Sequence, residues 1–176
     1  TYGIREDHCF ADYHDLIACP DVDVIDISTS NNAHFEVAKA AIEAGKPFCL
    51  EKPVTLTAEE ADILAKAAQE KGIPNMVCFS YRFKAAARYA KELVEKGMLG
   101  DIYHVYMQYL QGGGGPSYDL PRSWRYQKKL TGTGALGDLG CHALDLVSFV
   151  TGKNYRKAVG HTDTYVTQRR LEEGEG

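Results

Sequence analysis

The chain has 176 residues, of which 44% are hydrophobic and 25% are charged, and its formal net charge is −4. This length is enough for one ordinary domain or for parts of two. The charge balance lacks the basic footprint of a nucleic-acid-binding protein, the apolar stretches are too short for a membrane span, and no signal peptide begins the sequence. Both ends of the sequence are abrupt, so we expect the sequence to be a fragment that is cut off at both ends.

The five cysteines are scattered along the chain and form no C-x-x-C pair. An odd, scattered set favours reduced thiols, because a disulfide framework needs paired cysteines and an oxidising compartment. We therefore expect a cytoplasmic protein with reduced thiols at Cys9, Cys19, Cys49, Cys78 and Cys141.

The first part of the chain predicts strands that alternate with helices. Residues 22–27 form a β-branched run typical of a buried strand, and residues 34–44 carry apolar side chains at helical spacing. A short strand is predicted at 48–50, a capping box at 57–60 begins a second helix, and a third strand is predicted at 75–79. This alternation predicts a parallel sheet with right-handed crossovers.

The later part of the chain has a different pattern. Residues 84–96 predict an amphipathic helix, residues 102–110 alternate like a strand of an antiparallel sheet, and residues 135–150 predict another helix. The Gly-rich segment 111–117 predicts a mobile connection. Weak alternation over 159–169 predicts the start of a further strand.

The predicted fold class is therefore α/β. Residues 1–81 are expected to form the latter part of a doubly wound (Rossmann) parallel sheet. Residues 82–176 are expected to form the first part of an α+β domain with an antiparallel sheet.

Lys52 is placed by the tripeptide Glu51-Lys52-Pro53 directly after the predicted strand at 48–50. In open α/β sheets ligands bind at the carboxyl edge, where this lysine is expected to lie. Pro53 restricts Lys52 to extended geometry, which helps to fix its direction. The functional hypothesis is a partly desolvated lysine aimed at a substrate hydroxyl, and the alternative is an exposed lysine at the end of a strand.

A polar turn, residues 28–34, joins the first predicted strand to the helix that follows. Free amides at a helix N-terminus suit a phosphate or a ribose. The alternative is that Ser, Thr and Asn only cap the helix, and both interpretations can hold together.

Asp138, His142 and Asp145 have the spacing that places side chains on one face of a helix. Such an acid–imidazole–acid stripe is either a ligand-facing surface or an ordinary surface ion pair with a solvated Asp145. Asp138 and His142 could also ligate one metal ion, but a third ligand is not obvious, so we expect no metal site.

Several segments together resemble the Gfo/Idh/MocA family of oxidoreductases. Each match is modest by itself, whereas their order and spacing make the resemblance strong over nearly the whole chain. The matching segments are residues 22–34, 41–53, 81–83, 99–102, 123–125 and 132–145.

The resemblance implies an NAD(P)-dependent dehydrogenase that transfers a hydride between nicotinamide and a sugar or polyol hydroxyl or carbonyl. It implies that Lys52 polarises the reacting hydroxyl, that His142 is the general acid/base, and that Asp138 orients His142 and binds substrate. Arg82 is implied to line the substrate side. The resemblance also implies that residues 1–81 belong to a dinucleotide-binding domain and that residues 82–176 serve substrate binding and dimerisation. The implied cofactor-binding residues are Ser28, Thr29, Asn31, His34, Glu51, Lys52, Trp124 and Arg125.

NAD and NADP are not distinguished, because the Gly-rich phosphate turn of the family and the acidic residue after it are not found in this sequence. The expected partner is a small sugar or polyol, with a homo-oligomer in the full-length protein and neither nucleic acid nor membrane as a partner. Three alternatives stay open: a truncated or non-catalytic sugar-binding relative, an NAD-dependent glycosidase on the same fold, and a metal-dependent hydrolase.

Overall fold

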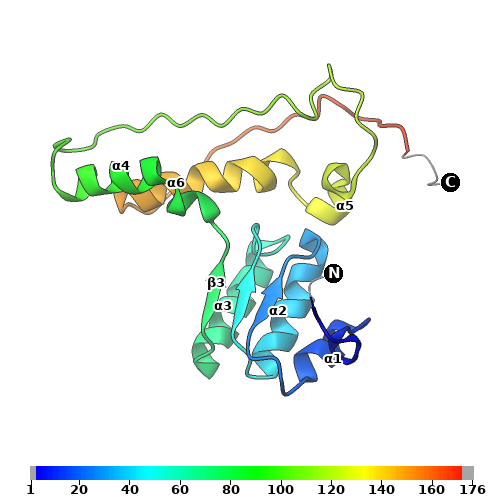
Figure 1. Cartoon of the computed structure of the whole chain (residues 1–176). Helices are drawn as coiled ribbons and strands as arrows, with labels where there is room; N and C mark the ends of the chain where they lie inside the picture. The colour runs from blue at the N-terminus through cyan, green and yellow to red at the C-terminus, as the bar shows by residue number, and fades with distance from the viewer. Residues whose placement is uncertain (1–2, 172–176) are drawn as a thin grey trace. The chain divides into compact units, whose positions relative to one another are not determined.

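The computed structural model of the chain describes residues 3–171. The chain divides into two compact units, Thr1–Cys78 and Phe79–Gly176, which are called unit 1 and unit 2 below and are coloured by residue number in Figure 1.

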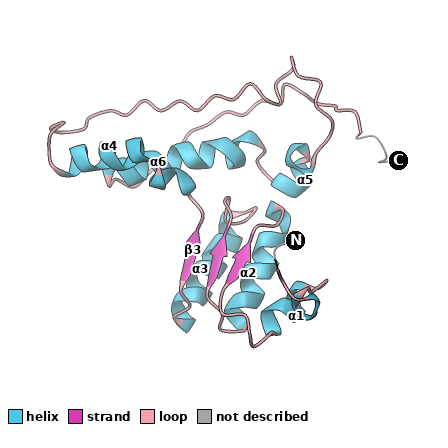
Figure 2. Ribbon diagram, in the orientation of Figure 1, coloured by secondary structure: helices cyan, strands magenta, loops and turns pink. Residues whose placement is uncertain are grey.

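Unit 1 is a three-stranded parallel sheet with helices, as the alternation of the sequence predicted (Figure 2). The strand order β1-β2-β3 follows the chain. Its elements are η1 (Glu6–His8), α1 (Tyr13–Ala18), β1 (Ile25–Ile27), η2 (Asn31–Ala33), α2 (His34–Glu43), β2 (Phe48–Leu50), α3 (Ala58–Lys71) and β3 (Asn75–Val77).

The hydrophobic core of unit 1 lies between one face of the sheet and its helices. Alternate strand residues point to opposite faces, and the buried set of β1 and β2 packs with apolar residues of α1, α2 and α3. The core residues are Ile17, Ile25, Ile27, Val37, Ala38, Ala41, Ile42, Phe48, Leu50, Leu64 and Ala68. The opposite face of the strands carries Asp26, Cys49 and Met76.

Local sequence signals set the ends of these helices. The predicted capping box of α3 is confirmed, since the Glu60 amide donates to Thr57 Oγ1 at 3.2 Å and the Thr57 amide donates to Glu60 Oε2 at 3.3 Å. Gly72 ends α3 in the left-handed conformation, with φ of 65°. Helix α1 was not predicted, although Asp12 caps it by accepting from the His14 amide at 2.8 Å.

Unit 2 is helical in its described residues. Its elements are η3 (Ser80–Phe83), α4 (Ala85–Glu95), η4 (Trp124–Tyr126), α5 (Lys128–Thr131), the π-helical turn η5 (Leu136–Gly140) and α6 (Cys141–Thr151). Helices α4 and α6 pack against each other. The helices predicted at 84–96 and 135–150 are thus present, but the second begins with a wide π turn.

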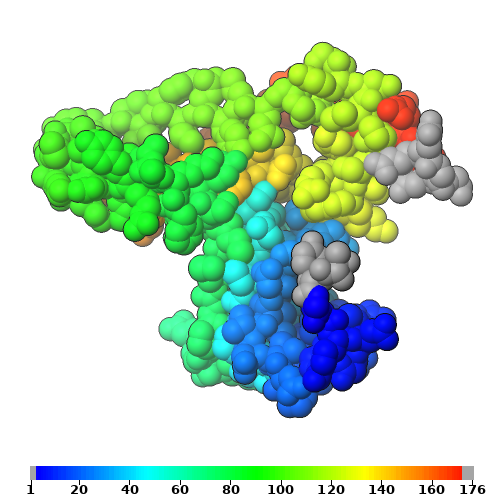
Figure 3. All heavy atoms as spheres, in the orientation of Figure 1, coloured from blue at the N-terminus to red at the C-terminus, as the bar shows by residue number. Residues whose placement is uncertain are grey.

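The antiparallel sheet predicted for the second domain is not present in the described residues of unit 2. Residues 101–110 and 159–169 contain no strand, and Tyr103 and Tyr106 of this stretch are 93% and 78% exposed. Alternating residues favour extended backbone, but a strand forms only when a neighbour completes its hydrogen-bond ladder. The space-filling view shows atoms of this part of the chain at the surface (Figure 3).

Within the described part of the chain, no helix has the length and apolar character needed to cross a membrane.

Candidate functional site residues

Lys52 lies at the carboxyl edge of the parallel sheet in unit 1. The Glu51 amide donates to the Ile27 carbonyl at 3.0 Å, which continues the ladder between β1 and β2 up to the residue before Lys52. The Lys52 amide donates to Glu51 Oε2 at 3.1 Å, and the peptide bond to Pro53 is cis. Lys52 therefore leaves the sheet at a position that the backbone fixes, half-buried.

The polar turn after β1 lies at this same edge, because parallel strands end together. The side chains of Ser28 and Thr29 are exposed, whereas Asn31 is buried. Ser28 Oγ donates to Asp26 Oδ2 at 3.2 Å, and Ser30 Oγ donates to Asn32 Oδ1 at 2.8 Å. The edge thus offers exposed hydroxyl groups next to a lysine, a set that suits the ribose and phosphate groups of a dinucleotide.

His34 has a different position from the rest of this turn. Its side chain is fully buried, with an exposed fraction of 0%. Nδ1 lies 2.8 Å from the Pro53 carbonyl oxygen, and Nε2 lies 3.2 Å from the Thr29 carbonyl oxygen. His34 therefore ties the turn after β1 to the segment that carries Lys52, a role that the sequence pattern did not indicate.

His142 lies in the first turn of α6 in unit 2, among aromatic rings. Its imidazole stacks on Tyr81 with ring centroids 4.2 Å apart and an angle of 12°, and it meets the edge of Phe79 at 6.1 Å. The Tyr81 hydroxyl is 2.5 Å from the Tyr109 hydroxyl, a contact that raises the pKa of Tyr109. These contacts fix the plane of the His142 ring.

Asp138 is not on the regular helix that carries His142. It lies in the π turn η5, where its amide donates to the Gly134 carbonyl at 2.9 Å, and its side chain is exposed. The helix predicted over 135–150 thus starts as a π turn that contains Asp138 and continues as a regular α-helix from Cys141. The shared face of Asp138 and His142 stays a prediction.

Arg82 is paired with Asp145, the last acid of the predicted stripe. Its Nε donates to Asp145 Oδ2 at 2.8 Å and its Nη2 donates to Oδ1, an arrangement that raises the pKa of Arg82. The guanidinium carbon also lies 5.5 Å from the centre of the Phe79 ring and 5.6 Å from that of Phe149. Asp145 is therefore not the solvated acid that the surface interpretation expected, since its side chain is only 8% exposed.

Trp124 and Arg125 are neighbours in the short turn η4 of unit 2. The Arg125 guanidinium carbon lies 4.5 Å from the centre of the Trp124 ring, within cation–π range. The two side chains therefore form one local pair.

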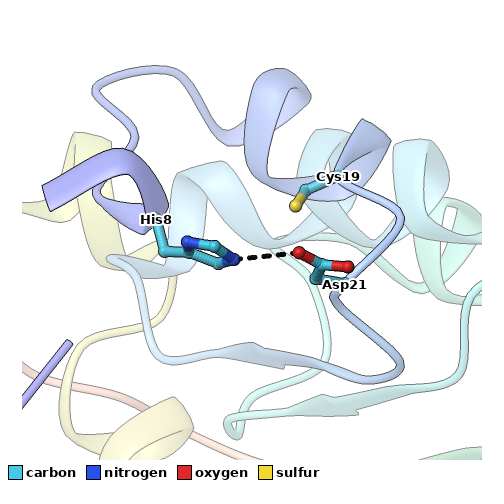
Figure 4. Close-up of side chains that lie close together, drawn as sticks. All are labelled: His8, Cys19 and Asp21. Atoms are coloured by element: carbon cyan, nitrogen blue, oxygen red, sulfur yellow. Dashed lines mark hydrogen bonds and ion pairs between the residues drawn. The ribbon is translucent and has the colours of Figure 1, made fainter. Parts of the chain in front are cut away.

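Two groups of described residues have donor atoms close enough for a metal ion, and neither includes Asp138 or His142. One is His8, Cys19 and Asp21, in which His8 Nε2 lies 3.1 Å from Asp21 Oδ2 (Figure 4). The other is Asp26 of β1, Cys49 of β2 and Cys78, which directly follows β3.

A parallel sheet with a polar turn and a lysine at its carboxyl edge defines unit 1 as Rossmann-like. The match to the oxidoreductase family with an NAD-binding Rossmann fold covers residues 1–79, and the match to the GFO/IDH/MocA C-terminal domain covers residues 87–174. The chain belongs to the Gfo/Idh/MocA family of oxidoreductases, and this confirms the resemblance.

Named relatives in this family include dehydrogenases of sugars and polyols. Levoglucosan dehydrogenase of Pseudarthrobacter phenanthrenivorans is 37% identical over 93% of this chain and 42% of its own length. The scyllo-inositol 2-dehydrogenase (NADP(+)) IolW of Bacillus subtilis is 36% identical over 72% of this chain and 34% of its own. The chain therefore spans about two fifths of the length of the first of these relatives.

Solved structures of oxidoreductases are also similar to this chain. An oxidoreductase domain protein from Kribbella flavida superposes with a TM-score of 0.87 at 40% identity, covering 92% of this chain and 44% of that one. A levoglucosan dehydrogenase in complex with NADH and levoglucosan superposes with a TM-score of 0.86 at 38% identity, covering 94% and 44%. These similarities confirm the predicted Rossmann-like half of the fold.

Proposed function

We propose that this chain is part of an NAD(P)-dependent dehydrogenase that transfers a hydride between nicotinamide and a sugar or polyol. The observation that carries the proposal is the position of Lys52, held by the β1–β2 ladder at the carboxyl edge of a parallel sheet. Its support is the family of the chain and the sugar and polyol dehydrogenases among the relatives.

The proposed reaction removes a hydride from the carbon of a substrate hydroxyl and a proton from its oxygen. A nicotinamide, when bound, accepts the hydride. In the proposal, Lys52 donates a hydrogen bond to the reacting oxygen, His142 takes the proton, and Asp138 binds substrate and orients His142. The stacking of His142 on Tyr81 supports this role, because an acid/base group must be held in one orientation.

The proposed cofactor contacts are assigned to two groups of residues. Exposed hydroxyls at the sheet edge suit ribose and phosphate groups, and the Trp124–Arg125 pair offers a flat, positively charged surface. We propose that His34 acts on this site by positioning the Pro53 carbonyl, and that Arg82 acts on the substrate side through its pair with Asp145. The direct cofactor contacts are proposed for Ser28, Thr29, Asn31, Glu51, Lys52, Trp124 and Arg125.

The test is whether the protein reduces NAD or NADP when each is assayed with levoglucosan, inositols and simple glucosides. Substitution Lys52→Ala should lower kcat/KM by about 100- to 10,000-fold, the range expected for a group that assists proton transfer. The matched control is Lys39→Ala, because Lys39 lies on the exposed side of α2 and its contact with Glu43 is a surface pair at 4.0 Å.

Unchanged kcat/KM in Lys52→Ala would refute the role of this lysine. Release of a sugar leaving group without net NADH would instead indicate a glycosidase that uses NAD transiently. Loss of activity with a chelator would favour metal-dependent hydrolysis, and sugar binding without turnover would favour a non-catalytic relative.

We also propose a cytoplasmic location and self-association of the full-length protein. The location is supported by the odd, scattered set of cysteines, which favours reduced thiols. Gel filtration of the full-length protein with light scattering tests the association.

A further inference from the structure

The geometry points to a binding site for a thiophilic divalent cation of the Zn²⁺ class, held by Cys49, Cys78 and Asp26 of unit 1. The three donor atoms lie within 4.8 Å of one another. Two sulfurs and one carboxylate oxygen are a donor set that zinc accepts, and three protein ligands leave a fourth position for water. This site is independent of the proposed dehydrogenase function.

The strand register explains why these side chains meet. Asp26 of β1 is paired with Cys49 of β2, so the two side chains point to the same face of the sheet. Cys49 is paired with Met76 of β3, and Cys78 follows two residues later on that same face. All three therefore project from the face opposite the one that packs on α2 and α3.

The same register favours a metal over a disulfide. Cys49 and Cys78 are diagonal neighbours on parallel strands. A strand spacing of about 4.8 Å and an offset of two residues of about 3.3 Å each place their Cα atoms about 8 Å apart, beyond the usual limit of about 6.8 Å for a disulfide. The two sulfurs are 3.1 Å apart. Tetrahedral Zn–S bonds of about 2.3 Å hold two sulfurs about 3.8 Å apart, so a small side-chain rotation is enough for an ion to enter.

The charges around the thiols also favour a cation. The carboxylate of Asp26 lies within 4.8 Å of both sulfurs, so negative charge surrounds the point between the three donor atoms. A divalent ion placed between these groups reverses the repulsion and stabilises the thiolates. Ser28 Oγ donates to Asp26 Oδ2 at 3.2 Å, which orients the carboxylate in the manner of an outer-shell partner.

The cluster in Figure 4 is the weaker candidate. Its His8 ring contacts Asp7 and Asp21, but the Arg5 guanidinium also lies against the ring, with Nη2 2.9 Å from Nδ1 and 3.1 Å from Nε2. A fixed positive charge at the ligand nitrogen opposes a cation. The strand site therefore carries the proposal.

The test is titration of the reduced protein with Cd²⁺ as a spectroscopic probe and with Zn²⁺ in competition. The expected result is one ion per chain, with ultraviolet thiolate-to-cadmium charge-transfer absorption that Zn²⁺ removes. Cys49→Ser and Cys78→Ser should each weaken binding by more than about 100-fold. Loss of an outer-shell partner already costs up to about 100-fold, and loss of a direct ligand should cost more. Asp26→Asn should weaken it by about 10-fold or more.

Cys19→Ser and His8→Ala are the matched controls, because they remove donors from the other cluster. Both should bind Cd²⁺ like the wild type. No stoichiometric binding by the wild type, or binding that persists in Cys49→Ser and is lost in His8→Ala, would overturn the proposal.

A measurement on the wild type covers the case in which a serine variant does not fold. Bound Zn²⁺ should slow alkylation of Cys49 by about tenfold or more, because a metal-held thiolate is not available to the reagent, and should leave the exposed Cys9 unchanged. Equal rates at Cys49 with and without Zn²⁺ would overturn the proposal.

Discussion

The buried contacts of His34 make this histidine the most informative residue to change in unit 1. His34→Ala removes a fully buried ring and leaves the carbonyls of Pro53 and Thr29 without their side-chain donor. A neutral imidazole carries one N–H, so it donates to one of these two carbonyls at a time. The shorter contact, 2.8 Å to Pro53, is the stronger candidate for that bond.

The expected loss of stability follows from these contacts. Leaving a buried acceptor unsatisfied costs about 1–3 kcal/mol, and the cavity left by the ring adds to this cost. We expect His34→Ala to lower the free energy of unfolding by about 3 kcal/mol in total. With a urea m-value of about 2 kcal/mol/M, the unfolding midpoint moves down by about 1.5 M.

Two conservative variants separate the two contacts. The amide nitrogen of Asn can replace Nδ1, and that of Gln can replace Nε2. His34→Asn should therefore keep the contact to Pro53 and recover more stability, and more turnover, than His34→Gln. Recovery of turnover by Asn but not by Gln would identify His34 as a residue that positions the Lys52 segment.

The control is His14→Ala, since His14 is an exposed histidine whose ring contacts Asp12 at 2.8 Å. Loss of such a surface contact should cost no more than about 1 kcal/mol. Urea unfolding followed by circular dichroism measures both variants. A change within about 0.5 kcal/mol for His34→Ala would refute the argument, because it would mean that the two carbonyls find other donors at no cost.

Two further predictions concern other parts of the chain. Arg82→Ala should lower the free energy of unfolding in urea by about 2–3 kcal/mol, because it leaves the carboxylate of Asp145 buried without its cation. The control Lys91→Ala breaks a surface pair with Glu95 and should cost less than about 1 kcal/mol. Equal losses in the two variants would contradict the reasoning. Because its pKa is raised to about 12, Cys78 should be alkylated slowly at pH 8, and its alkylation rate should rise about tenfold per pH unit above that pH. Peptide mass spectrometry measures this rate, and a level rate for Cys78 above pH 9 would contradict the raised pKa.

The parallel half of the fold could be predicted from short-range signals. The β-branched runs, the capping box at Thr57 and the glycine after α3 each act through their immediate neighbours in the chain, and the structure confirms each of them. Lys52 at the sheet edge follows from the same signals, because a residue that directly follows a parallel strand must lie at its carboxyl edge.

The antiparallel sheet and the π turn could not be decided from the sequence. Alternation over 102–110 describes the preference of one segment, and pairing depends on a second segment that supplies hydrogen bonds. Spacing along the sequence does not reveal that the turn before Cys141 is a π turn, because the apolar positions look the same in either helix.

By itself, the sequence determined the alternating strands and helices of unit 1, the start and end of α3 and the family to which the chain belongs, because these depend on residues close together in the chain or on their order. Only the tertiary structure decided that His34 is buried and contacts the Pro53 carbonyl, that Arg82 pairs with Asp145, and that Cys49 contacts Cys78 beside Asp26. Each of these contacts joins residues 19 or more positions apart. Such contacts depend on strand register and packing, which fix where a side chain points after the backbone has folded.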